Sequence, residues 1–412
     1  MKMINKFSLN DLFTIILRIF FTGSGLIVNF FLYNNFNLET FTNYILFIAA
    51  AETLSSILKF GMPTILLKLA SDLEAHEKYL KILSSYNSFN LITLSILSVL
   101  SFFLFKVDYI KSIFILVPLA SLFLTYQLVI FNLLRSKIKY NKIIYLESFV
   151  KNISFLLLLF CFNNIDESLI IIIFLLANII SLLFLIYYAN TIKMKIFIFS
   201  LNKNFFRSDG IQIAFFNILQ TVPKQMIYFS LKFYELNSLI AELKLALSFV
   251  NVIKIPNVAF ATKFSPKLVQ IKKIELQKFY LNKNFIIFSY TIFAFILLYF
   301  IVPDFIFKLI MYNNSLEIIS LAMLISVHIL IDACFSLNGT LLLMKSYQNK
   351  LLKNYFISNI ISLTIFFYLL YYSFSPKHVI ISFFIINSII ANFLNNLSLI
   401  KKMNINSYKL FQ

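Results

Sequence analysis

The chain has 412 residues, of which 60% are hydrophobic and only 13% are charged. Soluble proteins carry roughly 45 to 50% apolar and about 25% charged residues, so no water-soluble fold could bury this much apolar surface. The two cysteines, Cys161 and Cys334, are too few for a disulfide framework or a metal cluster. We therefore expect a membrane protein without a metal or other cofactor.

The apolar runs recur along the whole chain, and each is long enough to cross a hydrocarbon core about 30 Å thick as a helix. They lack the alternation of polar and apolar residues that is typical of transmembrane β-strands. The pattern therefore predicts an all-α membrane protein with about 12 transmembrane helices. In chain order we predict them over residues 11–33, 41–67, 84–105, 111–134, 144–162, 168–190, 209–231, 239–262, 284–302, 317–344, 352–373 and 378–399.

The basic residues indicate the orientation of these helices. An even number of crossings puts both termini on one side, and the termini and loops of that side hold 25 Lys or Arg residues. The loops of the opposite side hold six, namely Lys106, Lys111, Lys232, Lys244, Lys308 and Lys377. Because basic loops stay in the cytoplasm, we predict cytoplasmic termini. This topology and the anionic lipids of the membrane account for most of the net charge of +19, so nucleic acid is not an expected partner.

The helices fall into two related halves. Lys59 and Lys68 flank Pro63 in the second predicted helix, and Lys254 and Lys263 flank Pro256 in the eighth, and the lysines of each pair are nine positions apart. Six helices per half would relate the copies by an axis along the membrane normal. We predict an N-terminal six-helix lobe over 1–190, a basic and aromatic cytoplasmic linker over 191–208, and a C-terminal lobe over 209–412.

This layout, together with Gly61-Met62-Pro63 and the segment 261–268 (ATKFSPKL), resembles the Wzx-type polysaccharide flippases. These belong to the multidrug/oligosaccharidyl-lipid/polysaccharide (MOP) exporter superfamily. The resemblance implies two V-shaped six-helix lobes, as in MATE proteins, in the bacterial cytoplasmic membrane. It implies a flippase, not an enzyme, that moves an undecaprenyl-diphosphate-linked oligosaccharide to the outer leaflet for surface polysaccharide such as O-antigen of lipopolysaccharide. Membrane lipids and other polysaccharide assembly proteins are the implied partners.

Ionisable side chains inside predicted spans are costly, about 2.5 to 3.5 kcal/mol at a helix centre, and so are candidates for the transport pathway. Arg18, Lys59, Lys224 and Lys254 lie in predicted helices one, two, seven and eight, which line the central cavity in the resembled family. A cavity with these bases suits a diphosphate, which arginine binds bidentately and lysine binds as a point charge. The alternative is that some of them extend to the membrane surface or pair with acids.

Three further residues are candidates for ion coupling. His328 and Asp332 are four residues apart in predicted helix ten and share a face, which would suit a proton relay. An interhelical hydrogen bond is the alternative for this pair. Glu52 is seven residues before Lys59, and a structural pair with Lys59 or across a helix interface is the favoured interpretation.

Two other functions remain as alternatives to the flippase. A multidrug or ion-coupled exporter of the same superfamily would need an acidic cavity for cationic drugs, whereas the intramembrane charges here are mainly basic. A membrane-embedded polysaccharide polymerase usually has a large external loop with arginines, and the longest predicted external connection has only about fifteen residues. No Walker motif, nucleophile elbow or metal-ligand cluster occurs in the sequence, so we assign no catalytic residue.

Overall fold

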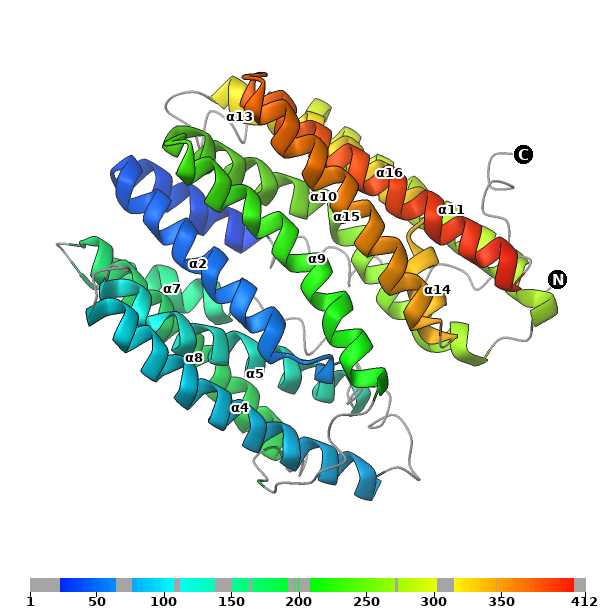
Figure 1. Cartoon of the computed structure of the whole chain (residues 1–412), viewed down its shortest axis with the longest axis horizontal. Coiled ribbons are helices and arrows are strands. Elements are labelled where there is room, and N and C mark those ends of the chain that lie inside the picture. Colours follow the sequence, from blue (N-terminus) through cyan, green and yellow to red (C-terminus); the bar gives the residue numbers. More distant parts are fainter. Residues whose placement is uncertain are drawn as a thin grey trace. The chain divides into compact units, whose positions relative to one another are not determined.

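In the computed structural model of the protein, the described residues are 23–63, 76–106, 112–137, 150–162, 165–191, 196, 199, 208–270, 273–301, 315–345 and 347–403. They form helices joined by turns, and none of them lies in a strand. Residues 23–35 are helical and precede a series of further helical elements (Figure 1). These are α2 (Leu38–Leu58), α4 (His76–Lys106), η2 (Ser112–Leu116), α5 (Val117–Lys137), α7 (Val150–Phe160), α8 (Glu167–Thr191), α9 (Ser208–Phe233), α10 (Asn237–Gln270), α11 (Lys273–Ile296), η5 (Leu297–Ile301), α13 (Ser315–Cys334), α14 (Leu337–Met344), α15 (Gln348–Tyr371) and α16 (Pro376–Met403).

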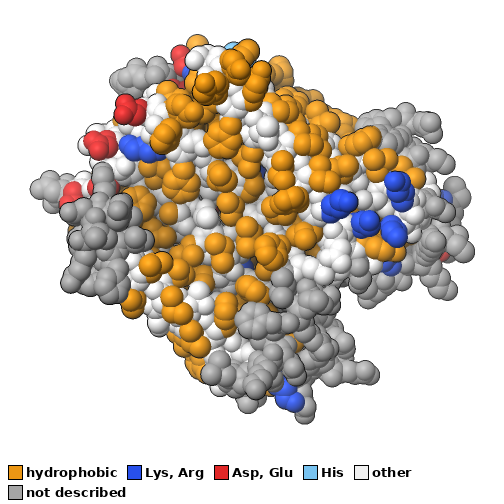
Figure 2. Space-filling view, in the orientation of Figure 1, with side chains coloured by type: hydrophobic (Ala, Val, Ile, Leu, Met, Phe, Trp, Pro, Cys, Tyr) orange, Lys and Arg blue, Asp and Glu red, His pale blue; other side chains and the backbone are white. Residues whose placement is uncertain are grey.

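The predicted all-α fold class is confirmed, because each of the predicted spans overlaps a described helix. Within the described ranges, eight segments are both long and apolar enough to cross a membrane: Leu38–Leu58, Leu80–Ser101, Phe114–Leu134, Glu167–Thr191, Glu275–Phe300, Leu316–Cys334, Gln348–Tyr371 and Pro376–Met403. Apolar side chains are spread over the whole described surface on the face drawn in Figure 2. Large ones such as Leu183 and Phe293 are 59% exposed, which is stable where the surroundings are lipid instead of water.

The chain divides into two compact units, one made of residues 36–237 and the other of residues 1–35 with 238–412. The predicted lobes, 1–190 and 209–412, have other bounds and stay a prediction. In the compact units residues 23–35 are grouped with α10, and α9 is grouped with α2. In the first unit α9 packs against α2. In the second, Asn29 donates a hydrogen bond to Ser248 of α10 at 2.9 Å, and the Phe30 ring meets the Phe249 ring edge to face. The predicted linker, 191–208, lies mostly outside the described residues.

Aromatic packing holds the first unit together around α2. Tyr44 and Phe47 of α2 meet Phe174 of α8 edge to face, and Phe155 of α7 joins the same group. All four side chains are buried. Because ring pairs of this kind add to the energy of burial, the group fixes α2 against α7 and α8.

The predicted helix over 317–344 is not continuous, and this prediction was wrong. α13 ends at Cys334, Phe335 and Ser336 form a turn, and α14 begins at Leu337. The apolar run contains no proline at this point, so its hydropathy gives no sign of a break. The turn forms because α11 supplies a replacement partner for the backbone: the Asn284 side-chain oxygen accepts from the Leu337 N–H at 3.2 Å.

Candidate functional site

The predicted site residues divide between the two compact units. Glu52, Lys59 and Lys224 belong to the unit of residues 36–237. Lys254 belongs to the other unit, together with His328 and Asp332. Arg18 lies outside the described residues. The structure therefore groups the candidates as one set on α2 and α9 and another on α10 and α13.

Glu52 connects the two helices of the first set. Its Oε2 accepts a hydrogen bond at 2.6 Å from the Nε2 of Gln225, which lies 173 residues further along the chain, on α9. In the described part of the chain this amide, and not the Lys59 ammonium, is the bonded partner of the carboxylate. Gln225 was not identified from the sequence, because a neutral amide in an apolar run carries no charge signal.

Lys59 lies where α2 ends. Its N–H still bonds to the Ser55 carbonyl at 2.9 Å, but Phe60 and Gly61 have positive φ angles of 44° and 71°. Two left-handed residues in succession turn the chain out of the helix, and glycine adopts this conformation without strain. The Tyr86 hydroxyl of α4 donates to the Leu58 carbonyl at 3.2 Å, so the bend is fixed from a neighbouring helix.

The two other described lysines have different surroundings. Lys224 follows Pro223 in the middle of α9 and is exposed. Lys254 lies inside α10, which continues through Pro256 to Gln270, and is half-buried. The segment around Lys254 thus keeps a helical backbone where the matching segment around Lys59 bends. Neither lysine lies at a predicted loop, so both remain candidates for a pathway through the membrane.

His328 and Asp332 both face α16. The Asp332 Oδ1 accepts from the hydroxyl of Ser388 and from the Nδ2 of Asn392, the latter at 2.8 Å. Ser388 also bonds to the His328 carbonyl at 3.2 Å, and the imidazole packs on the Phe384 ring with centroids 5.1 Å apart. The His328 Nδ1 bonds to the Ile325 carbonyl of its own helix. The carboxylate is thus held by neutral donors of α16, which is the interhelical hydrogen bond given above as the alternative to a relay.

Solved structures of similar fold cover almost the whole chain. A structure of the MATE multidrug transporter DinF-BH with a bound ligand matches with a TM-score of 0.71 and 12% identity, over 96% of this chain and 94% of that one. An inward-facing multidrug resistance MATE family transporter of the MOP superfamily matches with a TM-score of 0.66 and 13% identity, over 96% and 99%. The chain has the MATE fold. No protein-family model and no curated protein sequence matches it.

An outward-facing multidrug resistance MATE family transporter of the MOP superfamily is also similar, with a TM-score of 0.59 and 13% identity over 95% of each chain. At 12–13% identity this likeness shows the fold alone, and it does not select the Wzx type expected from the sequence resemblance. Eight described segments are long and apolar enough to cross a membrane, and the likeness in fold extends over 96% of the chain. The protein is therefore a multi-pass membrane protein.

A polar seam between α15 and α16 was missed by the sequence reasoning. Asn354 donates to Asn395 at 2.9 Å and to Ser398 at 3.0 Å, and Asn387 donates to Asn359 at 2.6 Å. These two helices lie side by side (Figure 1). The asparagines recur on α16 near the spacing of helical turns, which was the available signal, although in an asparagine-rich sequence it carries little weight. The seam continues to Asp332 through Asn392, so α16 joins α13 and α15.

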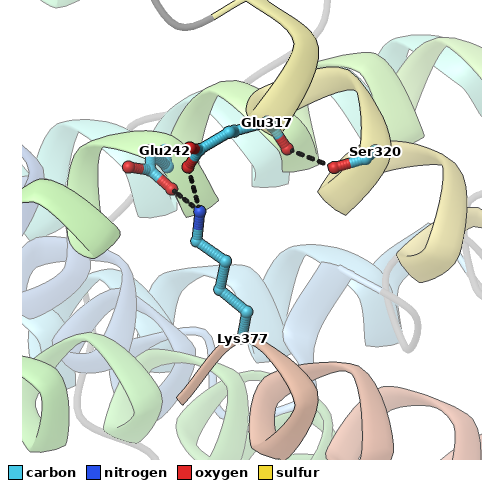
Figure 3. A network of polar contacts seen from close by, with 4 residues as sticks. All are labelled: Glu242, Glu317, Ser320 and Lys377. Atoms are coloured by element: carbon cyan, nitrogen blue, oxygen red, sulfur yellow. Dashed lines mark hydrogen bonds and ion pairs between the residues drawn. The ribbon is translucent and has the colours of Figure 1, made fainter. Parts of the chain in front are cut away.

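A second missed group joins the starts of three helices of the same unit. The Lys377 ammonium, near the start of α16, lies 3.0 Å from a Glu242 carboxylate oxygen of α10 and also pairs with Glu317 of α13 (Figure 3). The Glu317 backbone carbonyl accepts from the Ser320 hydroxyl at 2.8 Å. In the described part of the chain, no three His, Cys, Asp or Glu side chains are grouped so that they could hold a metal ion.

Proposed function

We propose that this protein is a secondary transporter that exports its substrate across, or to the outer leaflet of, the bacterial cytoplasmic membrane. The observation that supports this proposal is the MATE fold, which extends over 96% of the chain at a TM-score of 0.71. In such a transporter one half moves against the other around a central substrate site. The termini are proposed to be cytoplasmic, on the basis of the basic loops.

For the substrate we propose an anionic lipid-linked oligosaccharide, carried on undecaprenyl diphosphate. Three described lysines of the predicted spans, Lys59, Lys224 and Lys254, support a basic pathway. The acids predicted beside them, Glu52 and Asp332, are fewer and accept hydrogen bonds from neutral side chains. Hydrogen bonds between ammonium and phosphate groups are about twice as strong as neutral ones. Arg18 would add a bidentate contact.

Export of drugs is the second candidate, and the structural neighbours favour it, since they are multidrug transporters. A cationic drug would need an exposed carboxylate in the pathway. Glu52 or Asp332 would have to release its amide or hydroxyl partner to provide one. The same two carboxylates, with His328, are the proposed groups for coupling transport to an ion gradient.

The decisive experiment compares both substrates in one set of variants. Lys224→Ala and Lys254→Ala would be assayed for surface polysaccharide in the native host and for efflux of a cationic dye, at matched protein level in the membrane. Loss of a charge-assisted hydrogen bond costs about 1.5–3 kcal/mol, so affinity for a diphosphate would fall about tenfold or more. Lys350→Ala, which removes an exposed lysine near the start of α15, is the matched control.

Polysaccharide export that falls in the pathway variants and persists in the control would support the anionic substrate. Unchanged polysaccharide export together with altered dye efflux would contradict the anionic substrate and support drug export as the function. For coupling, His328→Ala and Asp332→Asn would be tested separately for gradient-dependent flipping in vesicles. Unchanged flipping in both variants would exclude these groups from coupling.

A further inference from the structure

The break between α13 and α14 leaves polar groups inside an apolar helix. Phe335 and Ser336 interrupt a run that is otherwise continuous over 317–344. Where a helix begins, its first N–H groups need partners from outside the helix. Without water in the hydrocarbon region, such groups must be satisfied by protein or by a bound ligand.

Part of this requirement is met by α11. The Asn284 Oδ1 accepts from the N–H of Leu337, the first residue of α14, at 3.2 Å. One turn earlier on α11, the Tyr280 hydroxyl bonds to the Asn338 Oδ1. The Asn338 N–H bonds to the Phe335 carbonyl at 2.9 Å. The carboxamides of Asn284 and Asn338 are thus both held at the start of α14.

Three polar atoms of this group are buried and have no hydrogen-bond partner in the described part of the chain: Asn284 Nδ2, Asn338 Nδ2 and Ser336 Oγ. Asn284 and Asn338 are completely buried. The Asn284 amide cannot be rotated end for end, since its oxygen must face the Leu337 N–H; its NH₂ group therefore remains at the helix start. Ser336 occupies the N-cap position of α14, yet its side chain makes no capping hydrogen bond.

All three unpaired atoms are able to donate, and the start of a helix carries partial positive charge. A ligand here must be an acceptor. Water would accept from two of the donors but would bring two protons that need acceptors of their own, whereas a halide accepts from every donor. Half-helices in membrane transporters direct their N-termini at anionic groups in this way.

We propose that the α13–α14 break binds one small monovalent anion, chloride, within the bundle. The ligands are Asn284 Nδ2, Asn338 Nδ2 and Ser336 Oγ. Asn284 and Asn338 are completely buried, so a bulky substrate headgroup would not reach these donors. Asp332, in the last turn of α13, has separate donors on α16 and does not compete for these groups.

The test measures chloride binding on the purified full-length protein in detergent. Thermal unfolding would be followed by tyrosine fluorescence while chloride replaces gluconate at constant sodium concentration. A ligand that binds the folded state raises the Tm with the logarithm of its concentration above Kd. We expect a saturable rise with chloride and with bromide, and crystals grown in bromide should show an anomalous peak at the break.

The variants separate this site from general salt effects. Asn284→Leu keeps the approximate size of the side chain and removes the donor, so the chloride response should disappear. Ser336→Ala removes one hydroxyl and should raise the half-saturating concentration about tenfold. Asn178→Leu is the matched control, because Asn178 is a completely buried asparagine of α8 in the other unit, and its chloride response should equal that of the wild type.

A wild-type Tm that does not respond to chloride would overturn the proposal and leave ordered water as the occupant. A full response retained in Asn284→Leu would overturn it as well. If Asn284→Leu does not fold, an unchanged half-saturating concentration in Ser336→Ala decides against the site. The experiment requires no transport, so its failure would not affect the proposed function.

Discussion

Replacing Lys377 by methionine tests the ion-pair group that joins α10, α13 and α16. A cation near the start of α16 is disfavoured by the helix dipole, so the two glutamates must offset this cost. The Lys377 ammonium lies 3.0 Å from Glu242, whose side chain is 11% exposed. In the Lys377→Met variant that carboxylate would keep its charge in a nearly dry position.

The exposures determine the expected loss of stability. Breaking a fully buried pair costs about 3–5 kcal/mol, whereas an exposed pair contributes about 0–1 kcal/mol. The Lys377 side chain is 36% exposed and that of Glu317 is 60% exposed, so water screens much of the interaction. We therefore expect Lys377→Met to lower the free energy of unfolding by about 1–3 kcal/mol, nearly all of it through Glu242.

Thermal unfolding in detergent measures this loss, and a double-mutant cycle assigns it. The Lys377→Met/Glu242→Gln variant no longer contains the unpaired charge, so it should be more stable than Lys377→Met alone. Lys353→Met, at an exposed lysine of α15, is the control and should change the stability by less than about 0.5 kcal/mol. A wild-type Tm in Lys377→Met, or a double variant no more stable than the single one, would refute the reasoning.

Three further substitutions test single contacts by the same unfolding measurement. Tyr86→Phe removes the hydrogen bond to the Leu58 carbonyl and should cost about 1 kcal/mol; no change would mean that the bend after α2 does not depend on it. Gly61→Ala places a side chain at a φ of 71° and should cost about 1–2 kcal/mol. Gly339→Ala is expected to stabilise α14 by up to about 1 kcal/mol, because alanine has the higher helix propensity. The added Cβ would lie 3.7 Å from Leu351 and 3.8 Å from the Tyr355 hydroxyl, which is ordinary van der Waals contact. Destabilisation would contradict this packing.

The positions of the membrane helices could be predicted from the sequence because each apolar run reports directly on its own burial in lipid. The neighbours of each helix could not. Hydropathy says that residues 209–231 cross the membrane, but not that α9 packs against α2. That choice depends on side-chain contacts such as Gln225 with Glu52, which join residues 173 positions apart.

The candidate site shows a similar limit. Glu52 and Asp332 could be identified as candidates from the sequence, since an ionisable residue within an apolar run is rare. Their partners, Gln225, Ser388 and Asn392, are neutral and common in this chain, so nothing set them apart. The sequence therefore shows which ionisable groups need a partner in the membrane. Which neutral side chains become those partners depends on how the helices pack.

The two helix interruptions differ in how far they could be foreseen, and the difference has a physical cause. The bend after α2 occurs at Gly61, a residue whose backbone freedom marks turns in any sequence. The break before α14 occurs at Phe335–Ser336, which have no such preference, and it depends on Asn284, 53 residues earlier on α11. Backbone strain also separates the two interruptions. Phe60, at the bend after α2, holds a positive φ of 44°, whereas Ser336, at the α13–α14 break, keeps a helical φ of −59°.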